Sequence, residues 1–125
     1  MYKGPFPYGL LNSFYYAFRG ISTVIKTQRN MKIHLFFASL TILTSYLFQI
    51  SRIEWMFIWI CIFSVLVTEA INTAIEKNID IYTQKTFNED AMLGKDIAAG
   101  AVLLSVFNAI VVSILIFFPK ITGTT

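Results

Sequence analysis

Three long runs that are nearly free of charge constrain this chain more than any other feature of its sequence. They cover residues 33–51, 55–76 and 97–118, and each approaches the ~20 apolar residues that a helix needs to cross a bilayer. Hydrophobic residues make up 56% of the chain and charged residues 14%, which fits neither a disordered chain nor a soluble globule. The runs therefore predict an all-α integral membrane protein with three transmembrane helices.

The segment before the first run has a different pattern. Residues 1–7 contain two prolines and predict a flexible N-terminus. In residues 8–28, apolar side chains recur every three or four positions with polar ones between them, which predicts an amphipathic helix lying on the membrane surface. We expect the whole chain to form a single membrane-embedded domain.

The positive charges indicate how the chain is oriented. Eight of the ten Lys and Arg residues lie before the first run or between the second and third, and only Arg52 and Lys120 fall on the other side. Positive residues mark the cytoplasmic side, so we expect the N-terminus and the second loop to be cytoplasmic. The net charge of +3 fits a basic segment that lies next to anionic lipid, and we expect no nucleic acid as a partner.

Six of the seven acidic residues lie between positions 69 and 96. Glu69, Asn72, Glu76 and Asp80 are spaced i, i+3, i+7 and i+11, which places them on one stripe of a helix. Three carboxylates in a column repel one another and stay ionised where a positive group lies among them. The candidates for that group are a divalent cation and Lys95.

Simpler interpretations exist for part of this stripe and for two residues outside it, Asp96 and His34. Glu76 and Asp80 could form a solvated helix end, Asp96 could stabilise the first turn of the third helix, and His34 fits packing and hydrogen bonding better than catalysis. Mg²⁺, however, is usually held by one or two carboxylates plus substrate phosphates. The stripe as a whole therefore indicates a cytoplasmic Mg²⁺–nucleotide site, with Glu69 deep enough to deprotonate a lipid hydroxyl.

Two sequence motifs carry a resemblance to a known family. Residues 69–76 read EAINTAIE and are followed by Asp80, and residues 95–103 read KDIAAGAVL. Over residues 12–120 the chain resembles the prokaryotic diacylglycerol kinases, and it looks closest to their Gram-positive branch, the undecaprenol kinases. Residues 29–34, RNMKIH, fit that branch too.

The resemblance implies a homotrimer in the bacterial inner (plasma) membrane, with a surface helix and three transmembrane helices per chain. It implies an active site between subunits at the cytoplasmic interface that uses Mg²⁺ and ATP. Gln28 stands where the family usually has a glutamate as a second Mg²⁺ ligand. The remaining implied roles are Glu69 as general base, Asn72 to orient the base or the lipid hydroxyl, Glu76 for Mg²⁺, Tyr16, Asp80, Lys95 and Asp96 for the nucleotide, and Ala99 near the lipid.

The sequence thus predicts a lipid kinase that transfers the ATP γ-phosphate to a membrane lipid alcohol, either undecaprenol or diacylglycerol. Two alternatives remain open. Gln28 could mark a catalytically silent family member with a structural or regulatory role. A column of carboxylates could also serve a small oligomer that conducts protons or cations through Glu69.

Overall fold

The structure is a computed structural model that describes residues 9–124. Within that range the chain is entirely helical, which confirms the all-α prediction. The four helices are α1 (Leu10–Thr27), α2 (Arg29–Leu47), α3 (Arg52–Thr83) and α4 (Glu89–Thr122). The predicted flexible N-terminus, residues 1–7, lies outside the described residues.

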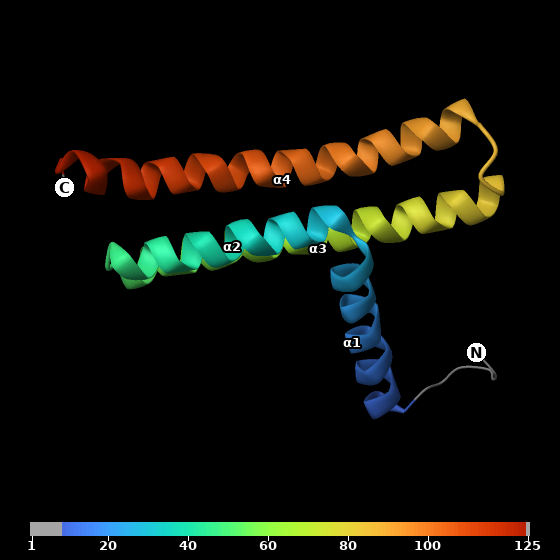
Figure 1. Cartoon of the computed structure of the whole chain (residues 1–125), viewed down its shortest axis with the longest axis horizontal. Coiled ribbons are helices and arrows are strands. Elements are labelled where there is room, and N and C mark those ends of the chain that lie inside the picture. Colours follow the sequence, from blue (N-terminus) through green and yellow to red (C-terminus); the bar gives the residue numbers. More distant parts are fainter. Residues whose placement is uncertain (1–8, 125) are drawn as a thin grey trace.

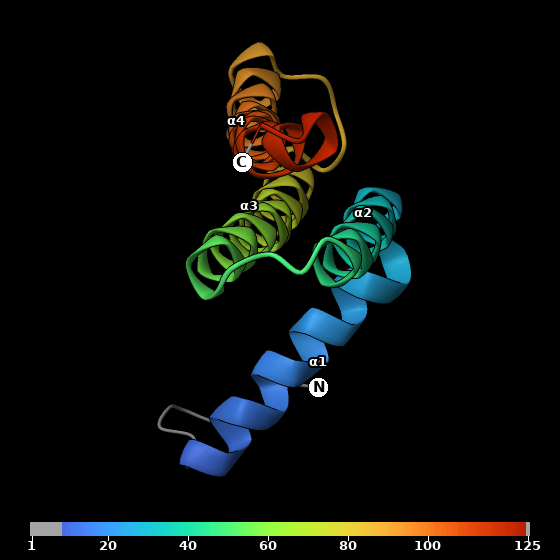
Figure 2. The same cartoon turned by 90° about the vertical axis from the view of Figure 1, so that its left-hand side faces the viewer.

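Helices α2, α3 and α4 run alongside one another, and α1 projects away from them (Figure 1). The end-on view shows α3 next to both α2 and α4 (Figure 2). The most extensive packing is between α3 and α4, while α2 packs on another face of α3, and within the described residues α2 and α4 share no close backbone contact. Helix α3 is therefore the centre of the bundle.

The corner between α2 and α3 corrects a predicted boundary. Helix α2 ends at Leu47, and not at residue 51, because Gln49 adopts a left-handed backbone conformation with φ of 50°. Ser51 then begins α3 with a capping box: its hydroxyl accepts from the Glu54 backbone N–H at 3.3 Å, and its own N–H donates to the Glu54 carboxylate at 2.7 Å.

The other two long helices extend beyond the predicted membrane segments. Helix α3 continues to Thr83, and α4 begins at Glu89. The polar loop expected between the second and third runs, residues 77–96, is therefore limited to residues 84–88. Asn88 caps α4 by accepting a hydrogen bond from the Ala91 backbone N–H at 2.9 Å. Lys95 and Asp96 consequently lie inside α4, and the interpretation of Asp96 as a residue of its first turn was wrong.

Polar contacts fasten α3 to α4 along their length. The hydroxyls of Thr68 and Ser105 are 2.8 Å apart in the middle of the pair. Lys120 forms an ion pair with Glu54 at 3.2 Å near one end, and a second ion pair, described below, lies near the other. Small hydroxyl side chains such as those of Thr68 and Ser105 are typical of helix contacts in membranes.

Two helices, α3 and α4, are long and apolar enough to cross a membrane, with mean hydropathies of 1.9 and 2.7 over their most apolar windows. Helix α2 carries Asn30, Lys32 and His34 in its first turns and does not reach that level. Crossing by α2 therefore stays a prediction. Helix α1 has no buried residue, and its large apolar side chains are exposed.

Candidate functional site

The predicted stripe of polar residues lies on one helix, α3, and its burial changes along that helix. Glu69 is 2% exposed and Asn72 is 5% exposed, whereas Glu76 and Asp80 are only partly buried. The burial increases from the loop end of α3 toward the middle of the bundle. The stripe thus places the Glu69 carboxylate in the interior and the other two carboxylates nearer the loop end of α3.

Glu69 faces a side chain from a different helix. The Nε2 atom of His34, on α2, is 3.6 Å from the Glu69 Oε2 atom, and these side chains are 18% and 3% exposed. The hydroxyl of Thr73 donates to the backbone carbonyl of Glu69 at 3.0 Å and so does not serve the carboxylate. The carboxylate is therefore paired with the one histidine of the chain.

Asn72 is hydrogen-bonded to the next carboxylate along α3. Its Nδ2 atom donates a hydrogen bond to the Glu76 Oε1 atom at 3.1 Å. Its Oδ1 atom is buried and has no hydrogen-bond partner in the described part of the chain. A buried amide oxygen without a partner costs about 1–3 kcal/mol, so this atom is suited to receive a donor or a cation from a ligand.

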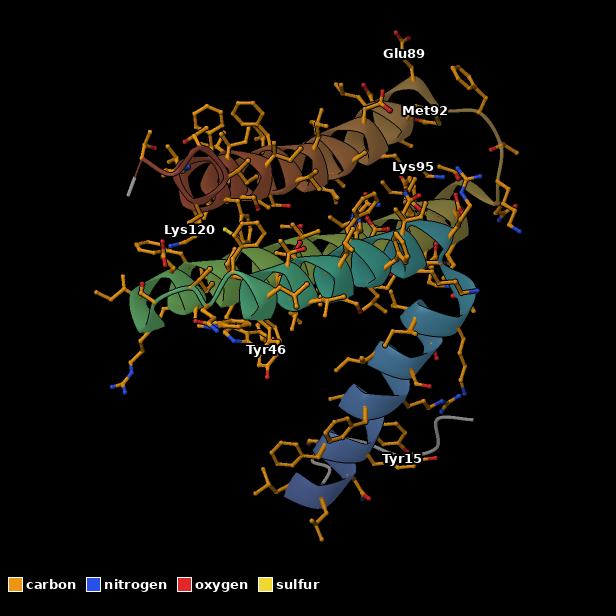
Figure 3. The ribbon with its side chains drawn as sticks, turned by 60° about the vertical axis from the view of Figure 1, so that its left-hand side comes forward. Tyr15, Tyr46, Glu89, Met92, Lys95 and Lys120 are labelled. Atoms are coloured by element: carbon orange, nitrogen blue, oxygen red, sulfur yellow. The ribbon has the colours of Figure 1, made fainter. Side chains whose placement is uncertain are left out.

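Asp80 and Lys95 bring the two helices together near the loop. The Lys95 ammonium donates a hydrogen bond to the Asp80 carboxylate and forms an ion pair with it. That hydrogen bond is the main reason why the pKa of Asp80 lies below its ordinary value. Figure 3 shows Lys95 close to the 84–88 loop.

A cavity of about 440 Å³ opens beside this ion pair. Asp80 and Lys95 form part of its wall, and Lys85, Asn88 and Met92 contribute from the loop and the start of α4. Two ammonium groups at one open cavity favour a ligand with several negative charges, such as a polyphosphate.

Tyr16 lies at a second cavity, between α1 and α3, of about 320 Å³. Arg19 joins it from α1, while Thr73 and Lys77 contribute from α3. This cavity borders the face of α3 that is next to the acidic stripe. Helix α1 is therefore placed to add side chains to the site.

A third cavity is apolar and lies between α2, α3 and α4, with a volume of about 370 Å³. Side chains such as Phe37, Ile62 and Ile110 form its walls. His34 also lines it, and the same side chain contacts Glu69. The His34 side chain therefore lies between this apolar groove and the buried carboxylate.

The remaining predicted residues stand apart from this arrangement. Gln28 lies at the junction of α1 and α2, where its Nε2 atom donates to the Thr27 hydroxyl at 3.2 Å. Ala99 is exposed, because the face of α4 that packs on α3 carries the buried Ala98 and Val102 instead. Asp96 is exposed on α4. Within residues 9–124, no three acidic, His or Cys side chains gather as a metal site.

Sequence reasoning attached no catalytic role to His34. The contact joins residues on different helices, so no local spacing could reveal it. The available signal was the presence of a single histidine at the start of an otherwise apolar segment.

The chain is similar in sequence to a known family and to known proteins. The family described as prokaryotic diacylglycerol kinase matches residues 15–117. The chain is 38% identical to an undecaprenol kinase of Bacillus subtilis (strain 168) over 109 residues, which are 87% of this chain and 88% of that protein.

A second similar protein is a diacylglycerol kinase of Synechocystis sp. (strain ATCC 27184 / PCC 6803 / Kazusa). It is 35% identical over 112 residues, which cover 90% of this chain and 64% of that longer protein. The family match includes all four residues of the stripe on α3 and both partners of the Asp80–Lys95 ion pair. The chain belongs to the prokaryotic diacylglycerol kinase family.

Proposed function

We propose that this protein is a lipid kinase that transfers the γ-phosphate of ATP to the hydroxyl of a membrane lipid, undecaprenol or diacylglycerol. The observation that carries the proposal is the position of Glu69, which is buried between an apolar groove and a column of polar side chains leading to an open, basic cavity. In this proposal the lipid approaches the carboxylate from the groove and the nucleotide approaches it from the cavity. The names of both relatives support this class of reaction.

Glu69 is the general base in this proposal. The lipid hydroxyl oxygen attacks the γ-phosphorus, its proton passes to the Glu69 carboxylate, and the bond from the γ-phosphorus to the bridging oxygen of ADP breaks. The apolar groove beside His34 accommodates part of the lipid chain. Such a site accelerates transfer mainly through positioning and charge neutralisation.

The donor set near Glu76 fits one Mg²⁺ ion held jointly with nucleotide phosphates. Glu76 supplies a carboxylate, and the unpartnered Oδ1 atom of the neighbouring Asn72 supplies a neutral oxygen. Mg²⁺ commonly takes only one or two protein carboxylates and completes its shell with phosphates and water. When bound, it would neutralise charge on the phosphates. Gln28 is a neutral candidate for a further ligand.

The nucleotide is assigned to the loop end of the bundle. Lys95 and Lys85 face its phosphates, with Asp80 holding Lys95 in place until the phosphates arrive. Tyr16, at the neighbouring cavity, and Asp96, exposed on α4, are further nucleotide contacts that the family resemblance implies and that lie outside the loop-end cavity. Lys95 is a compact point charge and suits a phosphate without bidentate geometry.

The finer features of the assembly are also part of the proposal. The protein is a homotrimer in the bacterial inner membrane, with α2, α3 and α4 crossing the bilayer and α1 lying on its cytoplasmic surface. The exposed apolar side chains of the three long helices support this placement. Ala99, exposed on α4, is placed to face the lipid or a neighbouring subunit.

The experiment that tests the function uses purified protein in mixed micelles with Mg²⁺ and γ-labelled ATP. Undecaprenol and diacylglycerol are offered separately, and labelled lipid is measured. We expect label in at least one lipid. Folded protein that labels neither lipid would contradict the proposal and favour a silent member, while cation flux through liposomes without ATP turnover would favour a conducting oligomer.

Replacing Lys95 with methionine is expected to raise the KM for ATP by roughly 10- to 100-fold, because a charge-assisted contact to phosphate contributes ~1.5–3 kcal/mol. The KM for the lipid should change little. The matched control is Lys120→Met, which removes the other Lys–carboxylate pair between α3 and α4. Equal effects of the two substitutions on the KM for ATP would show that Lys95 acts only by joining the helices.

A further inference from the structure

The pair formed by His34 and Glu69 joins two helices inside the bundle. The 3.6 Å between His34 Nε2 and Glu69 Oε2 is within ion-pair range but longer than an ordinary hydrogen bond. Catalytic hydrogen bonds are often long in a site without substrate and tighten when the substrate binds. Both side chains are largely shielded from solvent, which strengthens an interaction between them.

The surroundings give Glu69 few other partners. From α3, the charge of Glu76 acts on Glu69 and repels its carboxylate. On α4, Ser105 is neutral, and its hydroxyl is hydrogen-bonded to the Thr68 hydroxyl and to the Val102 carbonyl of its own helix. Among the described residues, His34 is the side chain that the structure pairs with this carboxylate.

His34 also lines the apolar groove that we assign to the lipid chain. One imidazole therefore contacts both the cavity for the acceptor and the group that must deprotonate it. A lipid chain in the groove would therefore contact the same imidazole ring that contacts Glu69.

We propose that His34 is a positioning residue for Glu69: its Nε2–H donates to Glu69 Oε2, holds the carboxylate in place, and leaves Oε1 to receive the proton of the lipid hydroxyl. Either the neutral ring protonated at Nε2 or the imidazolium can make this contact. The inference rests on the proposed kinase function and adds a residue that acts through the base.

The test compares His34→Leu, which has no donor, with His34→Gln, which keeps an N–H of similar reach. We expect His34→Leu to lower kcat by about 10- to 100-fold, the size of effect that misplacing a reacting group produces. The KM for ATP should stay within about twofold. His34→Gln should recover most of the lost kcat, because a donor to the carboxylate is restored.

Ser39→Ala is the matched control, since Ser39 is exposed on α2 outside the groove and its hydroxyl donates to the Leu35 carbonyl of its own helix. We expect it to retain wild-type kcat. Should His34→Leu fail to fold, as judged by its thermal unfolding in detergent, His34→Phe replaces it as the variant without a donor.

Two results would overturn the inference: a wild-type kcat in the variant without a donor, or the same loss of kcat in His34→Gln as in that variant. A wild-type protein that phosphorylates neither lipid would instead refute the kinase function itself. The two failures are therefore distinguishable in one set of assays.

Discussion

Replacing Glu69 with glutamine is expected to lower kcat for transfer to the lipid by about 100- to 10,000-fold, the usual contribution of a general base. At about 1.36 kcal/mol per tenfold, this is roughly 3–5 kcal/mol of transition-state stabilisation. Glutamine has nearly the same shape and still accepts a hydrogen bond from His34, but it cannot take a proton from the acceptor hydroxyl. The measurement is the rate of lipid labelling from γ-labelled ATP at saturating substrates.

The control for this substitution lies on the same helix. Glu54→Gln removes a carboxylate near the other end of α3, where it is paired with Lys120, and we expect kcat to remain within about twofold of the wild type. Binding of ATP should survive in Glu69→Gln, because the basic cavity near Lys95 is untouched. A Glu69→Gln protein that keeps more than a tenth of the wild-type kcat would show that another group takes the proton.

The column on α3 is the part of the site that the sequence predicts best. Residues spaced by three, four and seven positions share a face of any helix, so the relative placement of Glu69, Asn72 and Glu76 follows from the chain alone. The burial gradient along them was also predictable in part, because apolar neighbours flank Glu69 while Asp80 lies next to a polar stretch.

Contacts between helices were not predictable in the same way. The pairing of His34 with Glu69 depends on how far α2 is rotated and shifted against α3, and no spacing in the sequence records either quantity. The ion pair between Asp80 and Lys95 was anticipated only as a need for positive charge among the carboxylates. The structure identifies which helix supplies that charge and where.

Helix boundaries differed from the apolar runs for a physical reason. A run of apolar residues measures the segment that suits a bilayer, whereas a helix ends where its backbone is capped or turned. Gln49 turns the chain before the first run ends, and Asn88 caps α4 well before the third run begins. The long helices therefore extend past the apolar segments and carry Asp80 and Lys95 on ordered backbone.

The resemblance to the family gave roles to Gln28 and Ala99 that a single chain does not explain. Gln28 forms a hydrogen bond to Thr27 beside it, and Ala99 lies off the packed face of α4. In the homotrimer that we propose, a residue exposed on one subunit can face the site of the next. A functional role and an isolated position on the surface of one chain are therefore compatible for Ala99.

Replacing Glu76 with glutamine is expected to lower kcat by about 100-fold and to raise the Mg²⁺ concentration needed for half-maximal rate by about tenfold or more. The substituted amide oxygen still accepts the hydrogen bond from Asn72, so the local geometry persists while the negative charge is lost. A metal held by one protein carboxylate depends strongly on that charge. The measurement is the labelling rate over a Mg²⁺ titration at fixed ATP.

Glu89→Gln is the control, because Glu89 is exposed in the first turn of α4 and points away from the bundle (Figure 3). It removes the same charge from the same end of the bundle, and we expect the Mg²⁺ dependence to stay unchanged. If Glu76→Gln loses activity but keeps the wild-type Mg²⁺ titration, the negative charge of Glu76 serves the reaction by another route than the metal. Because the two explanations differ in the titration midpoint and not in the rate, this comparison separates them.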